Sequence, residues 1–209
     1  MEVSAVVATF GDPIWADRAR VAMASLEAQT LPPFEIIHVH GVSLQAARNE
    51  GAARAAGEWL CFLDADDMLD PHYLEAMAAH ELEADLLGPH VQYVFEGGKN
   101  LLRPAMPKVP GHTHDCGHQC LTDGNYLVVG TLVRKAMFVA VGGFWDEEFY
   151  EDWSLWLRCV VRAGATAVTV PEAVYIATHR YRSRNKAHTK AEKEAMHWRI
   201  HGSILGAPA

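Results

Sequence analysis

The sequence predicts an α/β fold with a mostly parallel central sheet flanked by helices, in a single domain of 209 residues. Short apolar runs bounded by polar residues alternate with longer stretches of small and apolar residues at helical spacing. The order strand, helix, strand, helix, strand favours parallel pairing with right-handed crossovers. Half of the residues are hydrophobic (50%), so a chain of this length can bury a substantial core.

The elements are expected in the following order. The first half should form strands at Val3 to Phe10, Phe34 to Val39 and Glu58 to Leu63, and helices at Pro13 to Gln29, Ser43 to Ala56 and 71 to 84, with Ser43 as a helix cap. The second half should form strands at Leu86 to Phe95, Tyr126 to Val133, 165 to 170 and 173 to 178, a helix at Asp152 to Ala163, and a polar C-terminal tail or helix. We find no internal repeat, low-complexity segment or interdomain linker.

Three acids follow directly on a buried strand. The run from Trp59 to Leu63 is short and apolar, and Asp64, Asp66 and Asp67 stand at its carboxyl end, where open α/β sheets bind ligands. Residues two apart in extended chain share a face, so Asp64 and Asp66 present two carboxylates that suit a hard divalent cation. The alternative is a solvated acidic turn that caps the next helix. Asp70, which precedes a proline, is assigned that capping role.

Two ordered blocks of sequence carry a resemblance to a known family. The first reads ARNEG at 47–51, AGE at 56–58 and FLDADD at 62–67; the second reads GGFWD at 142–146, FYEDW at 149–153 and LWLR at 155–158. Together they resemble inverting family 2 glycosyltransferases of the GT-A fold, over about residues 3 to 182. The resemblance implies one GT-A domain over 1–209, with a donor-binding half at about 1–95, an acceptor or catalytic half at about 96–180 and a basic C-terminal tail or helix at 181–209.

The resemblance implies metal-dependent transfer of a sugar from a nucleotide-sugar donor to an acceptor hydroxyl, with inversion. Mn²⁺ or Mg²⁺ would be held by Asp66, with Asp64 on the metal or the ribose and His179 as a further ligand. The general base would be Asp152, with Glu151 as the second candidate. An alternative for these last two acids is simple electrostatics at a helix start, because acids favour the positive end of the helix dipole.

Four further residues are assigned to the donor: Thr9, Arg48, Asn49 and Arg182. For Arg48 and Asn49 a surface arginine and a buried amide bonded to a neighbouring strand are equally weighted alternatives. The chain departs from the family where the second strand ends in HVHG at 38–41, because the usual base-reading aspartate is absent. The nucleotide is therefore not predicted. Gly130 indicates either a close approach of backbone to the donor or acceptor, or a bulge.

A basic stretch lies near the C-terminus of an otherwise acidic chain. Seven of the 18 Lys and Arg residues fall between 180 and 199, although the net charge is −8. The arginines are interpreted as a clamp for the donor diphosphate, or residues 180–190 as a contact for a polyanionic acceptor such as DNA carrying a modified base. A solvated tail is the third interpretation. The acceptor is left open among a glycan, a small molecule and nucleic acid.

The remaining signals concern metals, location and competing functions. The run His112 to Cys120 places a possible ligand at every second position, but such residues are about 6.6 Å apart in a strand, so a mobile acceptor-side loop is favoured over structural zinc.

We expect no membrane span, no signal peptide, reduced cysteines and a cytoplasmic location. A nucleotidyltransferase would need a Gly-rich phosphate loop that the segment after Val7 lacks. A sugar-nucleotide-binding protein without turnover remains an alternative.

Overall fold

The structure is a computed structural model that describes residues 1–95, 100–103, 121–122, 124–179 and 188–206. Its elements follow the chain as β1 Val3–Phe10, α1 Ile14–Glu27, β2 Glu35–Gly41, α2 Leu44–Arg54, β3 Trp59–Asp64, β4 Met68–Leu69, α3 Tyr73–Ala79, β5 Leu86–Phe95, β6 Asn100–Arg103, β7 Leu132–Arg134, α5 Lys135–Ala140, α6 Glu151–Ala163, β8 Ala167–His179 and α7 Lys190–Leu205.

A single mixed sheet runs through the molecule. Within the described residues it has eight strands in the order β2-β1-β3-β7-β5-β8-β4, with β6 pairing with β5 beside this path. The long pairings, β1 with β2, β1 with β3 and β5 with β8, are parallel. The short pairings made by β4, β6 and β7 are antiparallel. The predicted α/β fold with a mostly parallel sheet is confirmed.

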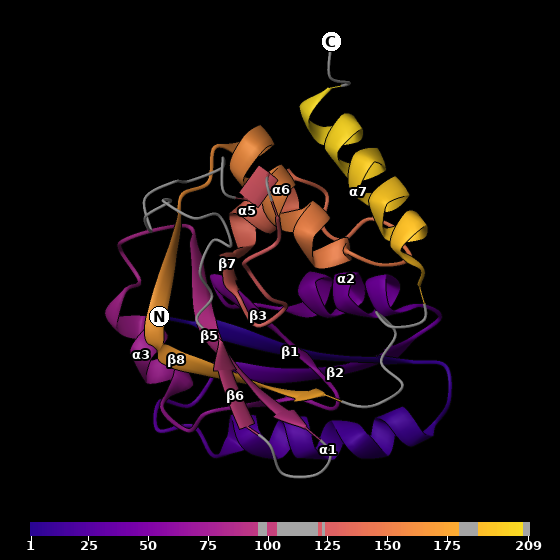
Figure 1. The fold of residues 1–209 in the computed structure, drawn as a ribbon. Coiled ribbons are helices and arrows are strands. Elements are labelled where there is room, and N and C mark those ends of the chain that lie inside the picture. Colours follow the sequence, from indigo (N-terminus) through magenta and orange to yellow (C-terminus); the bar gives the residue numbers. More distant parts are fainter. Residues whose placement is uncertain (96–99, 104–120, 123, 180–187, 207–209) are drawn as a thin grey trace.

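Helices cover both faces of this sheet, as Figure 1 shows. Helices α1 and α3 lie on one face, while α2, α5, α6 and α7 lie on the other. Alternate residues of β3 divide between the two cores: Leu60 and Phe62 pack under α6, whereas Cys61 and Leu63 pack under α1 and α3. Burial on both faces explains why this strand reads as a continuous apolar run.

Most predicted boundaries agree with the structure to within a few residues. The predicted cap at Ser43 is confirmed, because its hydroxyl accepts the backbone N–H of Ala46 at 3.1 Å. The assignment of Asp70 as the helix cap was wrong in position. Its carboxylate accepts the N–H of His72 at 3.0 Å within the turn, and α3 begins only at Tyr73.

Two predicted strand regions were wrong. Of Tyr126 to Val133, only the end pairs in the sheet as β7, because the preceding residues form an irregular segment that lines a cavity. The two strands predicted at 165–170 and 173–178 are one strand, β8. Opposite Pro89 and His90, its pairing jumps from Val170 to Val174, so the interruption read from the sequence is a bulge that includes a proline.

The C-terminal region contains a well-defined helix rather than a tail. Helix α7 begins with a capping box, in which Thr189 accepts the N–H of Glu192 while the Glu192 carboxylate accepts the N–H of Thr189. Met196, Ile200 and Ile204 bury one stripe of α7 in the core shared with α6. In the described part of the chain, no helix combines the length and apolarity needed to cross a bilayer.

Candidate functional site

The acidic turn of residues 64–67 lies where the strand order changes direction. β1 has β2 on one side and β3 on the other, and ligands of α/β sheets bind at the carboxyl ends of the strands at such a point. Asp64 ends β3, and the turn closes through a hydrogen bond from the Asp67 N–H to the Asp64 carbonyl at 3.0 Å. Asp64 and Asp67 line a cavity of about 640 Å³.

The start of α6 also lines this cavity. Glu151 and Asp152 open the helix, and both line the cavity with Tyr150 and Trp153. Among the described residues, Tyr150 is the non-glycine residue with positive φ, at φ 62° and ψ 22°. A left-handed backbone at a bulky residue is strained, and such strain concentrates at functional sites.

Asp152 is held in one orientation and is hard to ionise. Its two carboxylate oxygens accept the backbone N–H of Trp153 at 2.8 Å and the amide of Asn125 at 3.0 Å. Burial and the neighbouring Glu151 carboxylate raise the pKa of Asp152 to about 7. The structure thus gives one carboxyl in the cavity a pKa near neutrality.

Arg48 joins the two acidic segments. Its guanidinium donates to Asp64 Oδ1 at 2.6 Å and to Glu151 Oε1 at 2.9 Å, and the residue is 1% exposed. Burial alone would lower the pKa of Arg48, but the two carboxylates raise it above its ordinary value. Arg48 is therefore a permanent cation that holds β3 and α6 together, and the surface position considered from the sequence is wrong.

Asp67 differs from its neighbours in the turn. Its carboxylate is 9% exposed and accepts the phenol of Tyr175 at 2.6 Å and the backbone N–H of Thr178 at 2.7 Å. Burial, followed by the nearby Asp64 charge, raises the pKa of Asp67 to about 8. Asp66 lies between them and is partly exposed.

Asn49 makes contacts that favour the alternative to nucleotide binding. Its amide donates to the Phe144 carbonyl at 2.8 Å and accepts the Phe144 N–H at 2.9 Å. Gly143 has φ 66°, and a Cβ there would fall 2.6 Å from the Asn49 amide oxygen. Asn49 thus ties α2 to the loop before α6, and it lines neither of the cavities described.

Thr9 lies at the end of β1 beside two histidines of β2. The Thr9 hydroxyl is 3.1 Å from His38 Nε2 and 3.0 Å from His40 Nδ1, and the residue is 2% exposed. Burial and the nearby His40 lower the pKa of His38. Donor contact by Thr9 stays a prediction, and these histidines occupy the strand end where the sequence lacks a base-reading acid.

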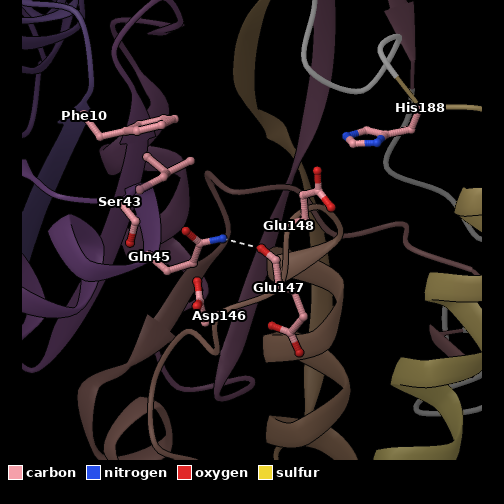
Figure 2. Close-up of a pocket in the computed structure, with 8 residues that line it drawn as sticks. Phe10, Ser43, Gln45, Asp146, Glu147, Glu148 and His188 are labelled. Atoms are coloured by element: carbon pink, nitrogen blue, oxygen red, sulfur yellow. Dashed lines mark hydrogen bonds between the residues drawn. The ribbon is translucent and has the colours of Figure 1, made fainter.

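A second cavity of about 420 Å³ lies beyond the end of β1. Figure 2 shows Gln45 donating to the backbone carbonyl of Glu147, with Phe10 on one side and His188 on the other. The chain passes from one cavity to the other here: residues 146–148 of the loop before α6 line this cavity, and Tyr150 with the first turn of α6 lines the larger one.

Helix α7 contributes a third wall to the larger cavity. Lys190, Lys193, Glu194 and His197 line it, and the His197 ring stacks on Trp153 with centroids 4.7 Å apart. The basic composition of this region pointed towards a ligand, although nothing in the sequence placed the helix against α6. Asn125 and Tyr175 gave no sequence signal, because neither belongs to a motif.

Several predicted ligands cannot be placed. Arg182 and the run His112 to Cys120 lie outside the described residues, and His179 is described only as the last residue of β8. Within the described part of the chain, no group of three or more His, Cys, Asp or Glu side chains is arranged to hold a metal ion. Cys61 and Cys159 are free and buried.

Comparison with known proteins shows a likeness to one family. Residues 16–115 match the family described as Glycosyl transferase family 2. A Bacillus subtilis (strain 168) protein named Uncharacterized glycosyltransferase YwdF is 26% identical over 180 residues, which cover 73% of this chain and 67% of that protein. Putative glycosyltransferase EpsH of the same organism is 43% identical over 44 residues, or 21% of this chain and 13% of that protein.

Solved structures agree on the fold. The crystal structure of S. aureus TarS 1-349 in complex with UDP-GlcNAc is similar with a TM-score of 0.72 at 18% identity, covering 100% of this chain and 68% of that chain. The complex of the same protein with UDP gives a TM-score of 0.66 at 19% identity, covering 100% and 67%. The fold is that of the GT-A-like glycosyltransferases. The chain is similar to family 2 glycosyltransferases over residues 16–115, and the two relatives named above bear glycosyltransferase names.

Proposed function

We propose that the larger cavity transfers a sugar from a nucleotide-sugar donor to an acceptor hydroxyl, with inversion at the anomeric carbon. The observation that carries the proposal is the position of Asp152, whose carboxyl lines the cavity across from the acidic turn and has a pKa of about 7. A general base works best when its pKa lies near the working pH.

The chemistry follows from the two walls. The acceptor oxygen attacks the anomeric carbon while the bond to the donor diphosphate breaks, and the acceptor proton passes to Asp152. Attack on the face opposite the leaving group inverts the anomeric configuration. Glu151 is a poor alternative base, because it is 3% exposed and its carboxylate pairs with Arg48. We assign Glu151 to holding Arg48.

The acidic turn fits a divalent cation that is shared with the donor. Mg²⁺ is usually bound by one or two carboxylates together with substrate phosphates, rather than by a complete protein cage. Asp66 and Asp64 would provide these carboxylates, since Asp64 gives Oδ1 to Arg48 and its side chain is still 35% exposed. Bound Mn²⁺ or Mg²⁺ would neutralise charge developing on the leaving diphosphate.

Two further observations support parts of the proposal. The TarS structures in complex with UDP-GlcNAc and UDP support a nucleotide-sugar donor. The identity of the donor's nucleobase stays open, because histidines stand at the end of β2. The buried free thiols of Cys61 and Cys159 support a reducing, cytoplasmic location.

The test is thermal unfolding with a panel of nucleotide sugars and nucleoside diphosphates, each with Mn²⁺, Mg²⁺ or EDTA. A ligand at about 100 times its Kd should stabilise the protein by about 2.7 kcal/mol, and only with the metal present. Asp66→Ala should lose this response, while the exposed Asp17→Ala should keep it. Undiminished metal-dependent binding by Asp66→Ala would remove the metal assignment, and no response of the wild-type protein to any donor would reject the proposal.

A further inference from the structure

Asp67 has no part in the chemistry proposed above, yet it is the most buried acid of the turn. Its two hydrogen-bond donors, Tyr175 and Thr178, both belong to β8 and lie more than 100 residues away in sequence. The carboxylate therefore connects the turn between β3 and β4 to the far end of β8. Both bonds are short, at 2.6 and 2.7 Å, so the side chain is fixed between two donors of the same strand.

The turn needs such a connection. Asp64 and Asp66 place two carboxyl groups two residues apart, and like charges repel at close range. The pairing that follows the turn is minimal, because β4 meets β8 only through Met68 with Ile176 and Leu69 with Tyr175. Two paired residues hold a segment weakly. The bonds of Asp67, together with the bond from the Asp70 N–H to the Val174 carbonyl at 3.0 Å, add to this attachment to β8.

Tyr175 is itself held from behind. A Cβ on Gly130 would fall 2.2 Å from the Tyr175 ring, so this glycine allows the backbone to lie directly against the ring. The Gly130 carbonyl in turn accepts the phenol of Tyr73 at 2.6 Å. The Gly130 backbone therefore does lie close to another group, the Tyr175 ring, while an approach to the donor or acceptor stays a prediction. It leaves the Tyr175 phenol little freedom to turn away from Asp67.

We propose that Asp67 is a positioning residue that clasps the acidic turn to the end of β8, with Tyr175 as its fixed partner. The clasp keeps the carboxylates of Asp64 and Asp66 in place against their mutual repulsion, and aligns them with the strand end at His179. This role rests on the proposed function, since it concerns how the same turn is held for the cation and the donor diphosphate.

Amide hydrogen exchange in the ligand-free protein tests the clasp directly. Asp67→Ala removes the acceptor of the Thr178 N–H, so exchange at that amide should rise by about tenfold or more relative to the wild-type protein. Asp67→Asn should restore protection, because its amide oxygen can accept the same N–H while its NH₂ faces the phenol oxygen. Unchanged exchange at Thr178 in Asp67→Ala would overturn the proposal.

Binding shows whether the clasp serves the site. Tyr175→Phe and Tyr73→Phe each remove one buried phenol hydrogen bond of 2.6 Å, so they form a matched pair, and only the first touches the acidic turn. Tyr175→Phe should raise the Mn²⁺ concentration for half-maximal binding of the nucleoside diphosphate selected on the wild-type protein by about tenfold, as loss of a group supporting a metal ligand does. Tyr73→Phe removes a bond to the Gly130 backbone behind the Tyr175 ring but leaves the bond to Asp67, so its effect should be clearly smaller, at about twofold.

Equal binding by these two variants would overturn the positioning role. If the wild-type protein binds no nucleoside diphosphate with Mn²⁺, the proposed function fails, and the exchange experiment still decides whether Asp67 clasps β8.

Discussion

The cavity has two acidic segments, the turn after β3 and the start of α6. Both pair a carboxylate with the same arginine, but they differ in how exposed that carboxylate is. Each gives one carboxylate to Arg48: Asp64 from the turn and Glu151 from the helix. Asp64 remains one-third exposed beside its partner, whereas Glu151 is almost fully enclosed. The turn therefore keeps a partly exposed carboxylate beside Arg48, while in the helix it is Asp152, our proposed base, that is left without an arginine partner among the ion pairs of the described residues.

This difference shows that the number of acids in a motif says little about the number that react. In the turn, Asp67 is bound to β8, and in the helix, Glu151 is bound to α2 through Arg48. Each segment thus contains a structural acid next to one that we propose to act on the substrate or its cation. In the helix, burial and then like-charge repulsion from Glu151 raise the pKa of Asp152.

The bridge through Arg48 can be broken outright. Arg48→Met removes the cation and leaves two carboxylates without compensation, so the free energy of unfolding should fall by about 3–5 kcal/mol in urea denaturation. Adding Glu151→Gln in the same chain should recover part of the loss, because one of the two carboxylates becomes neutral. Arg20→Met, which removes an exposed arginine paired with Asp17, is the control and should change stability by less than about 0.5 kcal/mol. A loss below about 1 kcal/mol for Arg48→Met would show that the bridge does not hold the two segments together.

The division of roles within α6 predicts a large difference in turnover. Asp152→Asn preserves the shape of the side chain and can still accept the hydrogen bond from Asn125, but it cannot accept a proton. The value of kcat should therefore fall by about 10² or more, while donor affinity stays within a few-fold. Initial rates with a donor identified on the wild-type protein, together with nucleotide titration, measure both quantities.

Glu151→Gln is the matched variant for that experiment. It should lower the free energy of unfolding by about 1–3 kcal/mol, because it weakens a buried charge-assisted bond, and it should reduce kcat by less than about tenfold if Glu151 is not the base. Activity that survives in Asp152→Asn and collapses in Glu151→Gln would reverse the two roles.

The raised pKa of Asp152 predicts how kcat/KM depends on pH, and this effect is smaller than that of removing the carboxylate. A base must be deprotonated to work, and a pKa of about 7 means that kcat/KM should fall about tenfold as the pH drops from 8 to 6. His197 lines the same cavity, and burial lowers its pKa, so His197→Gln should leave this profile in place. A profile flat down to pH 5, or one abolished by His197→Gln, would contradict the assignment.

The donor side of the molecule was predictable because its signals are local. The run from Trp59 to Leu63 and the acids that follow define a strand end, and Ser43 marks the start of α2, so short stretches of sequence suffice. The contacts of Arg48 and Asp67 were not predictable, because each joins residues about 100 positions apart. Asn49 shows the same limit: its place mid-helix indicated a specific role, but only the fold reveals that its partner is Phe144.

The second half was less predictable because its strands are short or interrupted. The segment from Tyr126 to Gly130 has strand-like composition, yet it is shaped by Tyr73 and Tyr175 from other elements. The proline within β8 reads as a break, whereas pairing to β5 on either side of the bulge carries the strand through. In both places tertiary contacts override local preference.

The strand order described above also has a consequence for how the chain folds. β7 stands between β3 and β5, and β8 pairs with both β5 and β4, so the sheet cannot close until residues beyond 130 have joined residues before 95. The contacts that complete the acidic turn are thus among the most distant in the sequence. Chains dominated by such non-local pairings fold slowly. During synthesis, the first three strands would emerge well before the segments that hold their carboxyl ends in place, so an incomplete chain would carry the acidic motif in sequence but not its geometry.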